Sequence, residues 1–127
     1  MNIEKDYLKL LFTIKKRTLL FLSSKSILNL GDFINGFWFG FEYSDKKAKS
    51  IIIPFSSYVK RKYDVPETKN VYGCLLILSN SDEEKAFDLF FEELETFLKE
   101  NNIEIPEIKW FILIMPFYIT IKWHDTS

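Results

Sequence analysis

Acidic side chains recur at helical spacing in the last third of the sequence. Five of them fall within twelve residues: Glu84, Asp88, Glu92, Glu93 and Glu95. Without Glu93, the steps of four, four and three place the other four in one row on a helix, with Glu93 nearby. On a solvated helix face these carboxylates stay ionised, which suits them poorly to acid catalysis. The row is either an ordinary solvated face or a docking surface whose field attracts a basic partner protein.

A basic and aromatic segment offers a second candidate surface. Residues 58–63 read "YVKRKY", in which Lys60, Arg61 and Lys62 lie between Tyr58 and Tyr63. Basic side chains could follow phosphates while tyrosines stack on bases, so single-stranded nucleic acid is an alternative partner. The net charge of −1 and the pI of about 5.9 argue against it. We therefore interpret the segment first as a solvated basic turn on a core helix, and favour a partner other than nucleic acid.

Residues for metal or nucleophilic chemistry are scarce. The chain has one histidine, His124, and one cysteine, Cys74, fifty positions apart. Cys74 lies in the apolar run "GCLLIL", which lacks the positive neighbours that activate a thiol and is typical of a packed core position. The glycines at 31, 36 and 40 do not match a phosphate-binding loop. We expect no catalytic set, no metal and no cofactor.

Length and composition indicate one domain covering residues 1–127. Apolar residues make up 47% of the chain and aromatic residues 17%, enough for a core of its own. The charged start, with Glu4, Lys5 and Asp6, does not resemble an export signal. The apolar run 110–121 contains Pro116 and is shorter than the ~20 residues that span a membrane. We expect a cytoplasmic protein without membrane contact, and its oligomeric state stays open.

Two helices are predicted in the first half of the chain. Apolar residues at helical spacing predict one helix over residues 3–16. A similar pattern from Ile27 to Phe41 predicts a second, capped by Ser24 or Ser26. This helix includes "NGFWFGFEYS" (35–44), which could also be read as a strand. In the helical reading Gly36 and Gly40 share a face, and we expect a neighbouring backbone to approach them closely.

The second half is predicted less uniformly. Residues 55–64 suggest a short helix, whereas 71–79 and 108–123 are ambiguous between helix and strand. Ser81 and Glu84 form a capping-box pattern that predicts the start of a helix with an apolar stripe from Phe87 to Leu98. Alternation in "FYITIKW" predicts a strand pair around Pro116. The predicted fold class is mainly α or α+β, a single-domain helical bundle with a short C-terminal strand pair.

Several short motifs between residues 13 and 98 resemble those of small bacterial immunity proteins from polymorphic-toxin and contact-dependent growth inhibition systems. The matching residues are Lys25-Ser26, Phe33-Ile34, Gly36-Phe37, Tyr58-Val59, Lys62-Tyr63 and Glu84 to Phe91. Thr18-Leu19-Leu20 stands where the family pattern has Pro-Gly-Met, and the chain after residue 105 lies outside the match.

The resemblance implies a non-enzymatic cytoplasmic protein that binds a cognate toxin domain and blocks its active site or substrate surface. Toxins of these systems are often nucleases with basic clefts. Under this interpretation the acidic helix would dock in such a cleft, and nearby aromatic residues would supply anchor energy at the centre of the interface.

Overall fold

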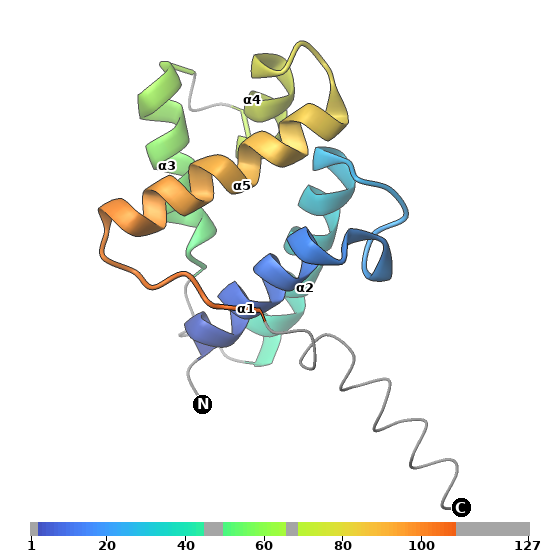
Figure 1. Cartoon of the computed structure of the whole chain (residues 1–127), viewed down its shortest axis with the longest axis vertical. Coiled ribbons are helices and arrows are strands. Elements are labelled where there is room, and N and C mark those ends of the chain that lie inside the picture. The colour runs from blue at the N-terminus through green and yellow to red at the C-terminus, as the bar shows by residue number, and fades with distance from the viewer. Residues whose placement is uncertain (1–2, 45–49, 66–68, 109–127) are drawn as a thin grey trace, which may run out of the picture.

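The computed structural model describes residues 3–44, 50–65 and 69–108 (Figure 1). Every regular element in these ranges is helical. In chain order they are α1 (Ile3–Lys16), the short 3-10 helix η1 (Thr18–Leu20), α2 (Ile27–Ser44), α3 (Ile52–Tyr63), α4 (Val71–Leu78) and α5 (Glu83–Glu100). None of these helices is both long enough and apolar enough to cross a membrane.

The predicted C-terminal strand pair is wrong, because the structure is helical and contains no strand in the residues that it describes. The residues around Pro116 that were to form the pair lie outside the described ranges. The residues just before them, Ile103 to Ile108, run as an extended connector across α1 (Figure 1). Their β-branched side chains reflect packing on a helix, because Ile108 is buried in the common core and Ile103 and Ile105 pack against it.

Helix α5 organises the bundle. It crosses α2, α3 and α4 and contacts all three, while α4 also packs on α2 and α3 (Figure 1). Helix α1 packs on α2 through Tyr7, whose ring lies 5.8 Å from Phe37 and 5.1 Å from Trp38. After α5 the chain returns to α1, where Lys16 Nζ donates a 2.9 Å hydrogen bond to the Ile108 carbonyl. All five α-helices therefore contribute to one core.

The apolar stripe of α5 is the centre of that core. Phe87, Phe90, Phe91 and Leu94 are each at most 1% exposed, and burial of one such side chain contributes on the order of 2 kcal/mol. The predicted cap is displaced by one residue: the Asp82 carboxylate, rather than Ser81, accepts the Lys85 amide at 3.0 Å. The same capping chemistry still starts the helix, since Asp and Ser are both good N-cap residues.

Helix α2 includes the aromatic stretch at 35–44, so its helical reading is confirmed. Ser26 caps it, as predicted, by accepting the Leu28 amide at 3.1 Å. The predicted close approach at Gly36 and Gly40 is wrong, because a Cβ at either position would meet nothing within 4 Å. The close approach occurs at Gly31 instead, where a Cβ would lie 2.8 Å from the Tyr72 ring of α4.

The ambiguous run at 71–79 forms helix α4 and the turn that follows it. Asn70 supplies the N-cap by accepting the Gly73 amide at 2.8 Å. Val71, Tyr72, Cys74 and Leu75 are buried against the neighbouring helices. An almost uniformly apolar helix shows no amphipathic period, whichever of its residues are buried, which explains why the sequence alone left this segment undecided.

Candidate functional site

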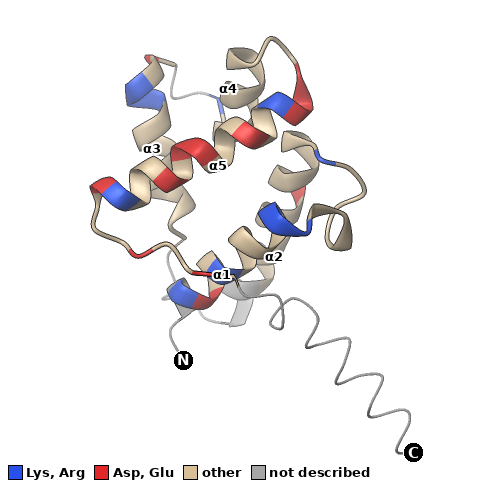
Figure 2. Cartoon of the chain, in the orientation of Figure 1, with Lys and Arg blue, Asp and Glu red and all other residues tan. Residues whose placement is uncertain are grey.

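The four-residue acidic row lies on the outer face of α5. Glu84 and Asp88 keep 70% and 52% of their side chains exposed, Glu92 is exposed and Glu95 is half-buried. Figure 2 shows acidic positions along the whole helix and lysines on the α1 side of it. Helix α5 contains seven acidic and two basic residues, which makes it the most acidic helix of the described chain.

Two lysines from the N-terminal part of the chain form ion pairs with three of the four carboxylates in this row. Lys25 Nζ lies 2.8 Å from Asp88 and 3.8 Å from Glu84, and Lys15 Nζ lies 2.6 Å from Glu95. The hydrogen bond to Asp88 raises the pKa of Lys25, against a smaller opposing effect of burial. The acidic row therefore has an internal role in joining the N-terminal part of the chain to α5.

Glu92 is the exception in the row. It lies one helical turn after Asp88 and one turn before Glu95, and it forms no ion pair with any described residue. Its charge is accordingly available to a molecule outside the chain.

Glu93 turns away from the row and into the protein. Its side chain is only 8% exposed, and its two carboxylate oxygens accept hydrogen bonds from Lys62 Nζ at 2.8 and 3.1 Å. The Tyr63 hydroxyl donates a third, at 2.7 Å. Burial raises the pKa of Glu93, but the hydrogen bonds from Lys62 and Tyr63 outweigh it, so that the pKa is lowered. Glu93 is thus an internal anion that joins α3 to α5.

The contact with Glu93 involves only part of the basic segment of α3. Lys62 lies 5.7 Å from the ring centres of both Tyr58 and Tyr63, and its hydrogen bond to Glu93 raises its pKa. Tyr58 packs on Phe97 with ring centres 5.3 Å apart. Burial and the Glu93 hydrogen bond raise the pKa of Tyr63 to about 12. We refer to Tyr58, Lys62, Tyr63 and Glu93 below as the α3–α5 cluster.

The remaining basic residues of the segment lie elsewhere on α3. Arg61 is exposed, and its Nε donates a 3.4 Å hydrogen bond to the Ser57 carbonyl. Lys60 is half-buried and has a contact of its own. The five residues proposed for nucleic-acid binding are therefore not presented together on one open surface.

A surface hollow of about 360 Å³ adjoins the row where α4 meets α5. It is lined by Leu78, Ser79, Asn80, Lys85, Asp88, Leu89 and Glu92. Leu78 is 37% exposed, and its neighbour Ile77 is 55% exposed. The turn above the hollow is tightly bent, with left-handed backbone at Asn80 and Ser81. The site therefore combines apolar walls with carboxylates, a mixture suited to protein recognition.

Glu92 also borders a second hollow, of about 340 Å³, on the other side of the row. Lys15, Lys25, Phe87, Asp88 and Phe91 complete its lining. On this side of Glu92, Lys25 and Lys15 already form ion pairs with Asp88 and Glu95. The α4–α5 hollow is the open side.

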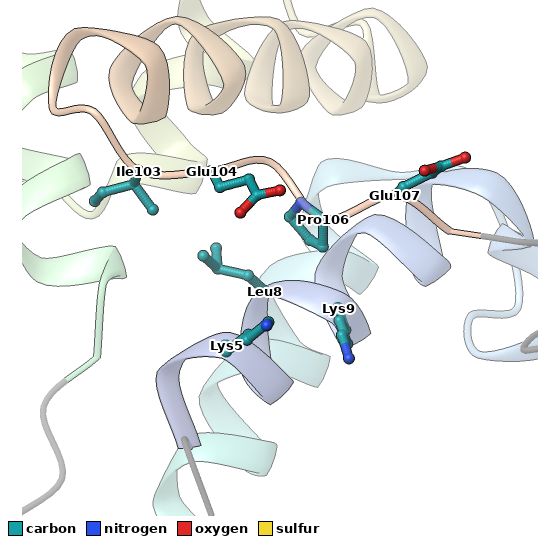
Figure 3. A pocket seen from close by; sticks show the side chains of 7 residues that line it. All are labelled: Lys5, Leu8, Lys9, Ile103, Glu104, Pro106 and Glu107. Atoms are coloured by element: carbon teal, nitrogen blue, oxygen red, sulfur yellow. The ribbon is translucent and has the colours of Figure 1, made fainter.

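A third depression, of about 360 Å³, lies between α1 and the connector that follows α5 (Figure 3). Lys5, Leu8 and Lys9 line it from α1, and Ile103, Glu104, Pro106 and Glu107 line it from the connector. Leu8 points toward Ile103 and Glu104, whereas Glu107 points away (Figure 3). Lysines on one wall and glutamates on the other give this groove no preference for a ligand of either charge.

The described residues contain no group of three or more histidines, cysteines or acids that could hold a metal. His124 lies outside the described ranges, and Cys74 is fully buried. No protein-family model matches the chain, and neither the curated proteins nor the solved structures include a significant match.

Two parts of this site were not predicted. The inward orientation of Glu93 had a signal, because Glu93 is three residues after Phe90 and four before Phe97, on the buried side of the helix. The hollow had a weaker signal, the apolar pair Ile77-Leu78 immediately before a polar turn. Its shape depends on how α4 and α5 meet, which no local pattern specifies.

Proposed function

We propose that this protein is a non-enzymatic immunity protein that binds a cognate toxin domain through the outer face of α5. The supporting observation is the exposed row of Glu84, Asp88 and Glu92 beside the α4–α5 hollow, whose walls include Leu78 and Leu89. Protein interfaces combine desolvated apolar anchors with a polar rim, and these elements lie next to each other on this face.

The mechanism is occlusion. A toxin that cleaves nucleic acid presents a basic cleft to its phosphates, and the negative face of α5 would be drawn to the same cleft by long-range attraction. Apolar side chains around the hollow would then hold the complex together by excluding water. Lys15 and Lys25 support this arrangement by fixing Glu95 and Asp88 in place before binding.

The nucleic-acid alternative has weaker support. Its central residues, Lys62 and Tyr63, are bound to Glu93, and freeing them for phosphates or bases would leave that carboxylate buried without partners. Titration of single-stranded RNA in a filter-binding assay separates the two functions. Salt-sensitive micromolar retention would support nucleic-acid binding, and an absence of retention would support the immunity function.

The structure improves the choice of residues for testing toxin binding. Asp88 and Glu95 hold lysines of the same chain, so their reversal would also disturb the fold. Glu84→Lys with Glu92→Lys changes the surface with less internal damage, because Glu92 has no ion pair among the described residues and Glu84 is 3.8 Å from its lysine. A matched control is Glu104→Lys with Glu107→Lys, which changes the net charge equally at the α1 groove.

The partner for this test is the toxin domain that the proposal predicts, to be sought as the variable C-terminal domain of a large secreted protein encoded immediately upstream of this gene. At low salt the Glu84/Glu92 double variant should associate at least about tenfold more slowly than wild type, and the control variant at close to the wild-type rate. Circular dichroism should show equal helix content in all three proteins. Equal association rates for both double variants would reject the α5 face as the docking surface.

A further inference from the structure

Two tyrosine hydroxyls inside the bundle take no part in the proposed function. Tyr7 of α1 is 3% exposed and Tyr72 of α4 is 5% exposed. Neither hydroxyl has a hydrogen-bond partner among the described residues. A buried hydroxyl without a partner reduces stability, which is why most buried polar atoms in folded proteins are hydrogen-bonded. Both hydroxyls therefore lack the partner that a core position normally provides.

Both tyrosines lie against the same face of α2. A Cβ at Gly31 would lie 2.8 Å from the Tyr72 ring, and the Tyr7 ring centre lies 5.1 Å from that of Trp38. Gly31 and Trp38 are seven residues apart, which is about two turns, or about 10 Å along the helix axis. Burial raises the pKa of Tyr72, and the charge of an ionised Tyr7 would raise it further. The second effect requires the two hydroxyls to lie near each other, so they belong to one polar cluster.

The Ser50 hydroxyl is a third member of this cluster. Ser50 stands at the start of α3, is 7% exposed, and its Oγ accepts the Ile52 amide at 3.1 Å. That bond uses a lone pair and leaves the hydroxyl hydrogen to be donated. Burial raises the pKa of Tyr7 to about 12, and the nearby Ser50 hydroxyl acts in the opposite direction, although no direct hydrogen bond joins the two side chains. Polar groups that approach each other without a direct bond are a common setting for a bridging water.

We infer that one internal water molecule binds between the hydroxyls of Tyr7, Tyr72 and Ser50. Water has two donors and two acceptor sites, so a single molecule can satisfy all three groups. Internal waters typically make about three hydrogen bonds to buried polar atoms that the chain leaves without partners. This water would tie α1 and α4 to the start of α3. The inference is independent of the proposed function, because the cluster lies in the core and not on the outer face of α5.

The surroundings of the cluster favour water over an ion. The Tyr7 ring packs on Phe37 and Trp38. The Tyr72 ring stacks on Phe90, with ring centres 6.1 Å apart. An ion bound among these rings and neutral hydroxyls would lose its hydration without gaining a counter-ion. A water molecule is neutral and supplies the missing donors and acceptors at once.

The experiment measures long-lived internal water by ¹⁷O magnetic relaxation dispersion of the full chain, a signal to which exchanging hydroxyl hydrogens do not contribute. The double variant Tyr7→Phe with Tyr72→Phe keeps both rings and removes two of the three groups that hold the water. Its dispersion amplitude should be lower than that of wild type by the contribution of one water molecule. Tyr58→Phe is the matched control, because Tyr58 is a half-buried tyrosine outside this cluster, and it should keep the wild-type amplitude.

Thermal unfolding gives a second test, whose sign separates a hydrated cluster from a dry one. If a water joins the hydroxyls, Tyr7→Phe and Tyr72→Phe each remove one of its hydrogen bonds and should lower the melting temperature by about 3 to 6 °C. If the hydroxyls have no partner, the same changes remove an unfavourable burial and should raise it. Equal dispersion amplitudes in wild type and the double variant, or a higher melting temperature in either single variant, would overturn the inference.

Discussion

The basic segment of α3 and the acidic row of α5 look equivalent in the sequence, since each is a group of like charges on a helix. In the structure they differ in the counter-ions that the rest of the chain provides for them. Lys62 pairs with the buried carboxylate of Glu93 in α5, and the Lys62 ammonium group also lies over the rings of two tyrosines. The α5 row faces outward, and two lysines form ion pairs with three of its four carboxylates. A cluster of charges is available for binding only where the chain has not supplied its counter-ions, so the comparison directs attention to Glu92.

The largest effect should come from breaking the α3–α5 cluster. Glu93→Ala removes the anion that holds Lys62 and Tyr63, and it leaves a small cavity at a position only 6% exposed. We expect a loss of about 2 to 3 kcal/mol in the free energy of unfolding, measured by urea denaturation at pH 7. The control is the adjacent Glu92→Ala, which should change stability by less than about 0.5 kcal/mol. Equal losses in the two variants would contradict the division into an internal and an external carboxylate.

The second effect is a pH dependence specific to the cluster. The pKa of Glu93 is lowered in the folded protein, so its ionised form stabilises the fold at pH values above the pKa it has when unfolded, about 4.3. That contribution disappears as the pH falls through the lower pKa of the folded state. Wild type should therefore exceed Glu93→Gln in unfolding free energy by about 1.5 kcal/mol at pH 7. The difference should shrink as urea titrations are repeated at acid pH, and a constant difference would contradict the prediction.

A smaller loss is expected for Tyr63→Phe. This change removes only the 2.7 Å hydrogen bond to Glu93 and keeps the ring, which should reduce the free energy of unfolding by about 1 kcal/mol. Tyr58→Phe is the comparison, because the Tyr58 hydroxyl accepts a hydrogen bond of 3.4 Å from Lys62 Nζ, which is longer than the bond from Tyr63 to Glu93. A greater loss for Tyr58→Phe would place the centre of the cluster at Lys62 instead of Glu93.

The smallest stability effect should come from the lysines of the α5 row. Lys15→Ala and Lys25→Ala each remove ion pairs between partly exposed groups, and we expect less than about 1 kcal/mol from either. Both changes should nevertheless speed association with the basic toxin domain that we propose as the partner, at low salt, because they make the face more negative. Stopped-flow kinetics measures this, and slower association of both variants would mean that the lysines themselves contact the partner.

Much of the helical framework was predictable. The spans of α1 and α2, the Ser26 cap and the apolar stripe of α5 follow local patterns of three and four residues, and the structure confirms them. Asn102 adopts a left-handed conformation just after α5, a position where asparagine is common. Local periodicity failed in α4, because that helix is short and almost uniformly apolar and so shows no amphipathic period.

The candidate site was predictable only as residue types. The sequence placed Glu84, Asp88, Glu92 and Glu95 in one row, but it could not show which of them the chain itself neutralises. Lys15 and Lys25 are about 60 to 80 positions away from their partners, and contacts at that separation depend on the packing of α1 and α2 against α5. The same limit explains why Glu93 and Lys62 were assigned to different surfaces.

The contact between Gly31 and Tyr72 has a consequence for recognising relatives of this chain. A side chain at 31 would collide with the Tyr72 ring, so a homologue with a larger residue there needs a smaller or displaced residue at 72. Paired variation at these positions is therefore a test of common ancestry that does not depend on overall sequence identity. It can be applied to chains whose surface charges have diverged.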